Sequence, residues 1–347
     1  MKSNWEEECE KLRKFVSDNP AIILTKNEIS IPQELRDQFY LQFDNVRSAL
    51  VDQHYSKLPV DVEGLCRQYL KIETEVIELL GIERVSMPVD LHSFLHAPKE
   101  GMARSIYSRL FDLLQGKTTM ESFEQQCIDD LNGSASELYR IGYEWWAGLT
   151  LVKLLEPEKA FFVDLDDDNK PFLTELKEIS FGRQAHHPTM RIPEFVLLSK
   201  RLGRYIAVKM AIAREIETYA RPGLRPPVRP KRPTGDTSLA LDSRVMLLSF
   251  MSGPHEVPII ADTYDCTLTS PDWMLECVTQ DEFRNPEAVE EVKYRLSALN
   301  PKLGSCMVVI GDSDQELEPV SEAIRTISVG FDETKFQPII ADLACKV

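Results

Sequence analysis

The chain has 347 residues, 43% of them hydrophobic, and a formal net charge of -16 at pH 7. A chain of this length can enclose substantial hydrophobic cores, and it favours two domains over one. The negative charge argues against broad, nonspecific adhesion to nucleic acid, because affinity for phosphates comes from Lys and Arg, although a local basic surface would override this. The sequence has no run of 18 apolar residues and begins without the apolar core of a signal peptide, so we expect a cytoplasmic protein with no membrane partner.

Residues 1–133 are expected to form a helical region. Apolar residues recur at intervals of three and four within residues 60–80, and Pro32 suits the first turn of an earlier helix. Further amphipathic segments follow, the last of them at residues 119–131, and Asn132-Gly133 is expected to end it. The pattern predicts an all-α subdomain.

The segment 161–179 carries the most informative pattern of the chain. Two apolar-rich runs flank a turn-forming Asp-Asp-Asp-Asn sequence, which predicts a two-stranded hairpin with acidic residues at alternate positions. If the turn pairs Asp164 with residue 173, then Asp164, Glu175 and Lys177 converge on one face. A register one residue different puts Asp164 on the far face, and the sequence leaves both registers open.

This pattern resembles the PD-(D/E)xK nuclease superfamily, in which a helix bearing an acidic residue leads into a hairpin with an Asp on one strand and Glu-x-Lys on the next. Glu175-Leu176-Lys177 is similar to the Glu-x-Lys element, and Asp164 is the nearest candidate for the Asp. Glu144, in a segment that opens with a capping box, resembles the helix acid. The resemblance covers about residues 134–220. Asp164 lies closer to Glu175 than is usual in the family, and no Pro precedes it.

The resemblance implies a nuclease that hydrolyses nucleic-acid phosphodiesters with Mg²⁺ or Mn²⁺. Hard divalent cations take oxygen ligands, so Asp164 and Glu175 would hold the metal. Lys177 would stabilise charge near the attacking water as a catalytic residue, and Glu144 would assist it. The alternative is a non-catalytic binding or scaffold protein with a degenerate nuclease-like fold. In that case the hairpin is charged because one face is solvated, and the acidic surface meets a protein partner.

A basic strip follows the hairpin. Residues 193–219 are predicted to form one long helix, and residues 221–240, rich in Pro and Arg, an extended linker between domains. A strip of this kind can follow a phosphate backbone, and its alternative role is a solubilising linker that docks on the acidic remainder of the chain. The predicted nucleic-acid contacts are Arg201, Arg204, Arg221, Arg225, Arg229, Lys231 and Arg232.

Residues 241–347 are predicted to form a smaller α/β domain, because strand-like and helix-like runs alternate there. The expected strands are residues 244–250, 257–262, 273–279, 305–311 and 336–341, and the expected helices are residues 286–299 and 315–327. The expected fold is thus of the α+β or α/β class: a helical region at 1–133, a nuclease-like α/β module at 134–220, a linker at 221–240 and the smaller α/β domain.

Overall fold

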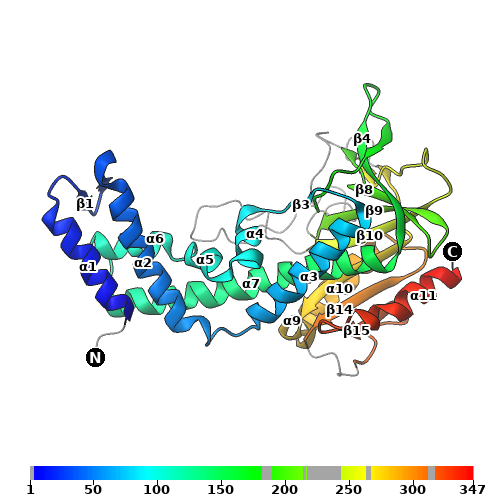
Figure 1. The fold of residues 1–347 in the computed structure, drawn as a ribbon. Coiled ribbons are helices and arrows are strands. Elements are labelled where there is room, and N and C mark those ends of the chain that lie inside the picture. Colours follow the sequence, from blue (N-terminus) through cyan, green and yellow to red (C-terminus); the bar gives the residue numbers. More distant parts are fainter. Residues whose placement is uncertain are drawn as a thin grey trace. The chain divides into compact units, whose positions relative to one another are not determined.

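The structure of the protein, a computed structural model, describes residues 4–181, 190–213, 216, 244–262, 267–311 and 317–346. It is a mixed α+β fold in which a helical N-terminal region is followed by an eight-stranded mixed sheet with interspersed helices (Figure 1). The chain divides into two compact units, Met1–Cys66 with Val89–Tyr139 and Arg67–Pro88 with Arg140–Val347. None of the helices described is long and apolar enough to cross a membrane.

The first unit is mainly helical, as the sequence predicts. An aromatic cluster forms part of its core, in which the rings of Phe39 and Phe43 both pack against Phe111. Its elements are α1 (Asn4–Asp18), β1 (Ile23–Thr25), β2 (Glu28–Ser30), η1 (Gln33–Leu35), α2 (Arg36–Tyr55), α4 (Val89–His96), α5 (Pro98–Ala103) and α6 (Tyr107–Leu114). Two further helices, α3 (Val62–Leu80) and α7 (Met120–Leu154), contribute residues to both units.

Helix α7 continues through Asn132-Gly133, so the predicted helix end and the capping box after it are wrong. Leu131, Ala135 and Leu138 are buried and keep the apolar face of the helix continuous across this point. One glycine in a helix interior costs about 1 kcal/mol relative to Ala. Burial of one Leu side chain, at about 1.5–3 kcal/mol, outweighs that penalty.

The second unit is built on the eight-stranded sheet, in the order β15-β14-β13-β10-β9-β8-β4-β5. Its strands are β4 (Pro157–Leu165), β5 (Pro171–Glu175), β8 (Phe195–Ser199), β9 (Arg204–Ile212), β10 (Arg244–Met251), β13 (Trp273–Thr279), β14 (Ser305–Ile310) and β15 (Ile324–Ser328). Neighbours from β5 to β13 are antiparallel, whereas β13, β14 and β15 are parallel. Helices α9 (Gln280–Arg284) and α10 (Pro286–Ala298) make the crossover that the parallel pair β13–β14 requires.

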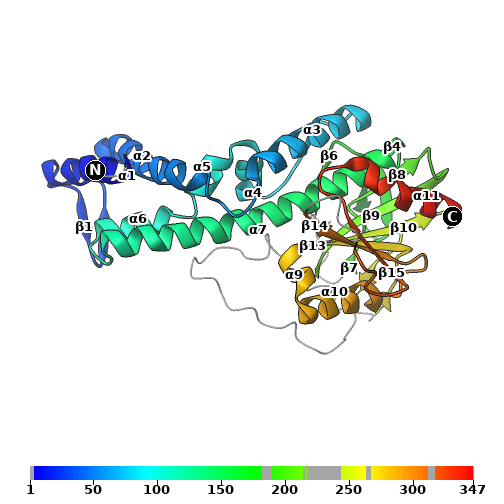
Figure 2. The same ribbon diagram turned by 90° about the horizontal axis from the view of Figure 1, so that it is seen from below.

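Helices cover both faces of this sheet (Figure 2). On one face, Gly148 of α7 lies close to Met210 of β9, and Trp146 contacts Phe336 in η3 (Glu333–Phe336), which leads into α11 (Gln337–Lys346). On the other face, Leu296 of α10 belongs to a hydrophobic cluster with strand residues of β10 and β13. Short pairings complete the unit: β3 (Arg84–Val85) with β6 (Glu178–Ile179), and β7 (Met190–Arg191) with β11 (Ala261–Asp262) and β12 (Thr267–Leu268).

The predicted long helix at residues 193–219 is wrong, because the chain there forms β8 and β9. Phe195, Val196 and Leu197 are consecutive and all buried, since the strand is covered on both faces. A run without alternation cannot be told from a buried helix by its period. The turn between the two strands needs a residue with positive φ, and Gly203, with a φ of 64°, adopts this conformation without steric cost.

The predicted separation of residues 134–220 from residues 241–347 is also wrong, because strands from both ranges form the same sheet. Strand β9 pairs with β10, and through that pairing the two ranges share one core. Two element types differ near the C-terminus as well. The predicted strand at 336–341 is the start of α11, and the described part of the predicted helix at 315–327 contains β15. The predicted linker at 221–240 lies outside the described residues.

The continuity of α7 through Gly133 leads to a test of that glycine. Gly133 and Gly116 are both exposed, and an added Cβ at either would meet no atom within 4 Å, but Gly116 has a φ of 68°. Gly133→Ala should raise the free energy of unfolding by about 0.5–1 kcal/mol, because Ala has the higher helix propensity. Gly116→Ala should lower it by about 1–2 kcal/mol, because the left-handed conformation strains a side chain. Urea unfolding of both variants measures this, and equal effects would contradict an uninterrupted α7.

Candidate functional site

The predicted hairpin is confirmed, and its tip determines its register. The backbone N–H of Asp166 donates to the carbonyl of Lys170 at 3.0 Å. The Asp166 carboxylate accepts from the backbone N–H groups of Asp168 and Lys170, at 2.9 and 2.8 Å. Asn169 has a φ of 59°, a conformation that Asn tolerates better than most residues. With the tip held in this way, Val163 pairs with Leu173.

This register separates the two predicted metal ligands. Asp164 pairs with Phe172, and Glu175 pairs with Phe161. Paired residues share a face of the sheet, and residues an odd number of positions apart point to opposite faces. Asp164 and Glu175 therefore lie on opposite faces of the hairpin, and the register that would have brought them together is wrong.

The remaining contacts of the predicted site are with the backbone. Asp164 accepts from the backbone N–H of Leu165 at 2.9 Å, and Glu175 is exposed at the end of β5. Lys177 lies beyond β5 and is exposed, and its carbonyl accepts from the N–H of Glu83 at 2.8 Å. A shared Mg²⁺ or Mn²⁺ does not fit this arrangement, because its two intended ligands face apart. Within the described ranges, no group of three or more His, Cys, Asp or Glu side chains could hold a metal ion.

Glu144, the predicted helix acid, lies on α7 and is 2% exposed. One carboxylate oxygen accepts from Nη1 of Arg140 at 2.8 Å, and the other accepts from the backbone N–H of Arg244 at 3.2 Å. Burial raises the pKa of Glu144 to about 7, against the lowering effect of Arg140. One oxygen is thus engaged within α7 and the other joins α7 to the beginning of β10. The described contacts of Glu144 include none with Asp164 or Glu175.

Two further buried ion pairs involve residues of the sheet, and the sequence pattern predicts neither pairing. Glu276 of β13 accepts from Nε and Nη2 of Arg295 on α10, with a shortest distance of 2.6 Å. Glu194 accepts from Nζ of Lys209 at 2.7 Å and from the backbone N–H of Met210 at 2.8 Å. The only signal available in the sequence was a charged residue inside an otherwise apolar run. Such a residue is buried only when a partner compensates its charge, and the partners here come from other elements.

The predicted nucleic-acid contacts are only partly described. Arg201 donates from Nη1 to Oε1 of Gln337 at 2.7 Å, and Arg204 is exposed at the start of β9. The other five, Arg221, Arg225, Arg229, Lys231 and Arg232, lie outside the described residues. The basic strip therefore stays a prediction.

The chain was also compared with known proteins. Neither protein-family models, nor curated proteins, nor solved structures gave a match to it. The interpretation of the site consequently depends on its own geometry and charge.

The burial of Glu144 leads to a test of pH dependence. Its pKa is raised from 4.5 to about 7 in the folded chain, so the stability it contributes is fully present below pH 4.5 and is lost as the pH rises through 7. Over this pH range the free energy of unfolding of wild type should fall by about 3 kcal/mol through this group. That of Glu144→Gln should not show this fall, because Gln does not titrate. The free energy of unfolding of Glu144→Gln should therefore rise relative to wild type over this range.

Urea unfolding at a series of pH values measures this difference. Glu287→Gln is the matched control. It is the same substitution, but Glu287 is exposed on α10 and lies outside the buried network. Its curve should run parallel to that of wild type. A parallel curve for Glu144→Gln would contradict the raised pKa.

Proposed function

We propose that this protein is a non-catalytic binding or scaffold protein with a degenerate nuclease-like fold, and that the β4–β5 hairpin is its protein-binding element. The register of the hairpin carries this proposal, because it directs Asp164 and Glu175 to opposite faces. The third acidic residue, Glu144, is engaged by Arg140 and Arg244. The three acids thus lie in separate environments. Asp164 is on β4, Glu175 is exposed at the end of β5, and Glu144 is buried between α7 and β10.

The hairpin has the chemistry of a surface for a basic protein partner. Between Pro157 and Glu175 the sequence carries six acidic and two basic residues. At its tip Asp168 has a side chain 78% exposed, and nearby on β5 Phe172 is 41% exposed. Arg combines a charge for carboxylates with a planar group that stacks on aromatic rings. A partner surface rich in Arg therefore complements this hairpin.

A divalent-metal-dependent nuclease is the second candidate. The order of elements supports it, since α7 with Glu144 leads into a hairpin whose second strand is followed by Lys177. For Asp164 to join Glu175, however, β4 would have to slip by one residue, and Val163, now 1% exposed, would move to the other face. Exposing one such side chain costs about 1.5–3 kcal/mol. The register favours the binding protein.

The first test is metal-dependent cleavage of labelled DNA and RNA by wild type, Glu175→Gln and Lys177→Ala. We expect no cleavage that depends on Glu175 or Lys177, and no rise in melting temperature with millimolar Mg²⁺ or Mn²⁺, because a stabilising ion must bind the folded state. Both variants should change stability by less than about 0.5 kcal/mol, since they are exposed. Cleavage by wild type that is abolished in both variants would instead establish the nuclease.

The second test measures binding of an Arg-rich peptide by fluorescence anisotropy. The variant Asp167→Asn/Asp168→Asn/Glu175→Gln removes three exposed charges from the hairpin and leaves Asp166, which holds the turn. We expect about tenfold weaker binding, and an affinity in wild type that falls with added salt. The control Glu34→Gln/Glu121→Gln/Glu287→Gln removes three exposed charges elsewhere and should bind like wild type. An equal loss in both triple variants would show that net charge alone attracts the peptide.

A further inference from the structure

Helix α4 carries two histidines on its exposed side. His92 and His96 lie one turn apart, and side chains at this spacing share a face of a helix. Both are exposed, whereas Leu91, Phe94 and Leu95 of the same helix are buried. The two imidazole rings stack, with their centroids 4.1 Å apart and their planes at 11° to each other. The two rings are therefore close enough to contact one ligand.

Buried contacts hold the backbone that carries this pair. The carbonyl of Phe94 accepts from Sγ of Cys66 at 3.3 Å. Gly101 of α5 packs directly on the helix, because a Cβ added there would lie 2.6 Å from the backbone nitrogen of Phe94. A ligand of the two histidines would thus have to order only their side chains, on a helix that is already fixed.

A hydrogen bond determines which nitrogen of His96 can bind a metal ion. Nδ1 of His96 lies 3.0 Å from the carbonyl oxygen of His92. A carbonyl only accepts, so Nδ1 carries the hydrogen and donates it, and the neutral ring has its lone pair on Nε2. Most metal-binding histidines hold their second ring nitrogen in a hydrogen bond of this kind, which sets the tautomer and raises the basicity of the ligand.

The separation of the two rings suits a single tetrahedral ion. With Zn–N bonds of about 2.0–2.1 Å, two nitrogens on one such ion lie about 3.3 Å apart. The rings are 4.1 Å apart and face each other, so at least one of them has to turn before both lone pairs point at the same ion. The outer torsion of a His side chain is broad, and His92 is exposed, so this rotation costs little.

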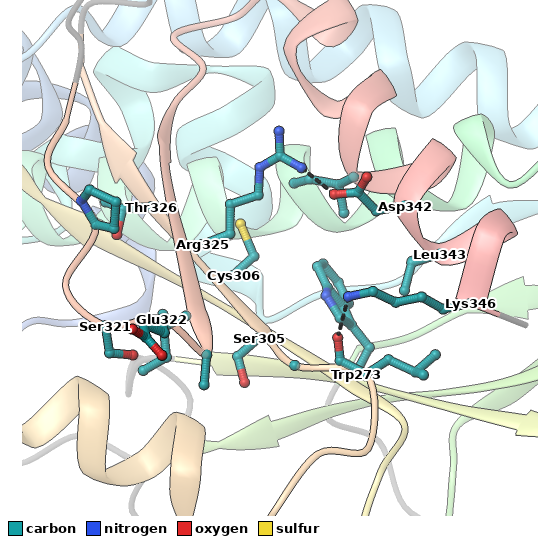
Figure 3. Close-up of a pocket in the computed structure, with 16 residues that line it drawn as sticks. Trp273, Ser305, Cys306, Ser321, Glu322, Arg325, Thr326, Asp342, Leu343 and Lys346 are labelled. Carbon is teal, nitrogen blue, oxygen red and sulfur yellow. Dashed lines mark hydrogen bonds and ion pairs between the residues drawn. The ribbon is translucent and has the colours of Figure 1, made fainter.

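The basic side chains at the cavity of about 740 Å³ among β14, β15 and α11 are, by contrast, engaged within the protein (Figure 3). Arg325 pairs there with Asp342, and Lys346 donates to the carbonyl of Leu303 at 3.3 Å. A ligand would have to displace these contacts, and the described lining contains no imidazole. The histidine pair on α4 is therefore the stronger candidate for a ligand site.

We propose that His92 and His96 together bind one divalent transition-metal ion of the Zn²⁺ class. Neutral imidazole is a good ligand for Zn²⁺, Cu²⁺ and Ni²⁺, whereas Mg²⁺ takes oxygen ligands. Two protein ligands leave the other coordination positions to water, so we expect an affinity in the micromolar range. The site uses no residue of the hairpin, and it is independent of the proposed protein-binding function.

The experiment titrates the full chain by calorimetry with Zn²⁺, and with Mg²⁺ as the comparison ion. We expect Zn²⁺ to bind and to raise the melting temperature, because it binds the folded state, and Mg²⁺ to do neither at this pair. His92→Gln and His96→Gln should each weaken Zn²⁺ binding about tenfold or more, since each removes one of two ligands. Without metal, both variants should melt like wild type, because both positions are exposed.

His255→Gln is the matched control, because it makes the same substitution at an exposed residue after β10. Cys345→Ser removes an exposed thiol, which is also a zinc ligand. Both controls should bind Zn²⁺ like wild type. The proposal is overturned if Zn²⁺ does not bind saturably, if Mg²⁺ binds equally well, if only one or neither of the two α4 variants loses affinity, or if either control loses as much as they do.

Discussion

The pairing of β9 with β10 is the constraint on which the second unit depends. The two strands pair in register from Tyr205 with Met251 to Ile212 with Arg244, and they join parts of the chain that lie on either side of residues 213–243. Strand β8 extends the sheet on one side and β13 on the other. Because α7 and α11 cover one face and α10 the other, the central strands have no solvated face and are apolar at nearly every position.

Charges inside such a sheet have to be compensated locally. Glu144 with Arg140 and Glu194 with Lys209 are buried pairs in which a backbone N–H donates to the second carboxylate oxygen. In the third buried pair, Glu276 accepts from two nitrogens of Arg295. Removing one member of a buried pair leaves an uncompensated charge, which typically costs about 3–5 kcal/mol. The pairs thus favour one packing of α7 and α10 on the sheet over others. They also explain why a buried glutamate on a helix before a hairpin need not belong to a catalytic site.

The hairpin shows how one local turn determines the chemistry that a surface can perform. Alternation along β4 and β5 decides which residues of one strand share a face, but it does not decide which residues of the two strands lie opposite each other. The hydrogen bonds of Asp166 and the left-handed Asn169 determine that pairing. As a result the same acidic residues form two separate surfaces instead of one metal site. The charged edge with its exposed Phe172 is the surface on which the proposed protein-binding function depends.

By itself, the sequence determined the elements whose pattern is local. The periodicity of residues 60–80 and 286–299 predicts α3 and α10, and the turn residues of 161–179 predict the hairpin, because amphipathic faces and turn conformations are properties of neighbouring residues. The buried strands β8 and β9 replace the predicted helix, since a run that is apolar on both faces of a strand has no period that distinguishes it from a buried helix. Pro338 likewise lies in a short apolar run that predicts a strand, but it occupies the first turn of α11, where its missing N–H is tolerated.

Only the tertiary structure decided which elements meet. The candidate acids Glu144, Asp164 and Glu175 are visible in the sequence, but Glu144 acquires its partners Arg140 and Arg244 from a neighbouring turn and from a strand 100 residues away. Likewise, residues 134–220 and 241–347 read as separate domains until β9 pairs with β10. The register, the strand partners and the partners of buried charges all depend on residues that are distant in the chain. The interactions between these residues form only when the sheet is assembled and both of its faces are covered.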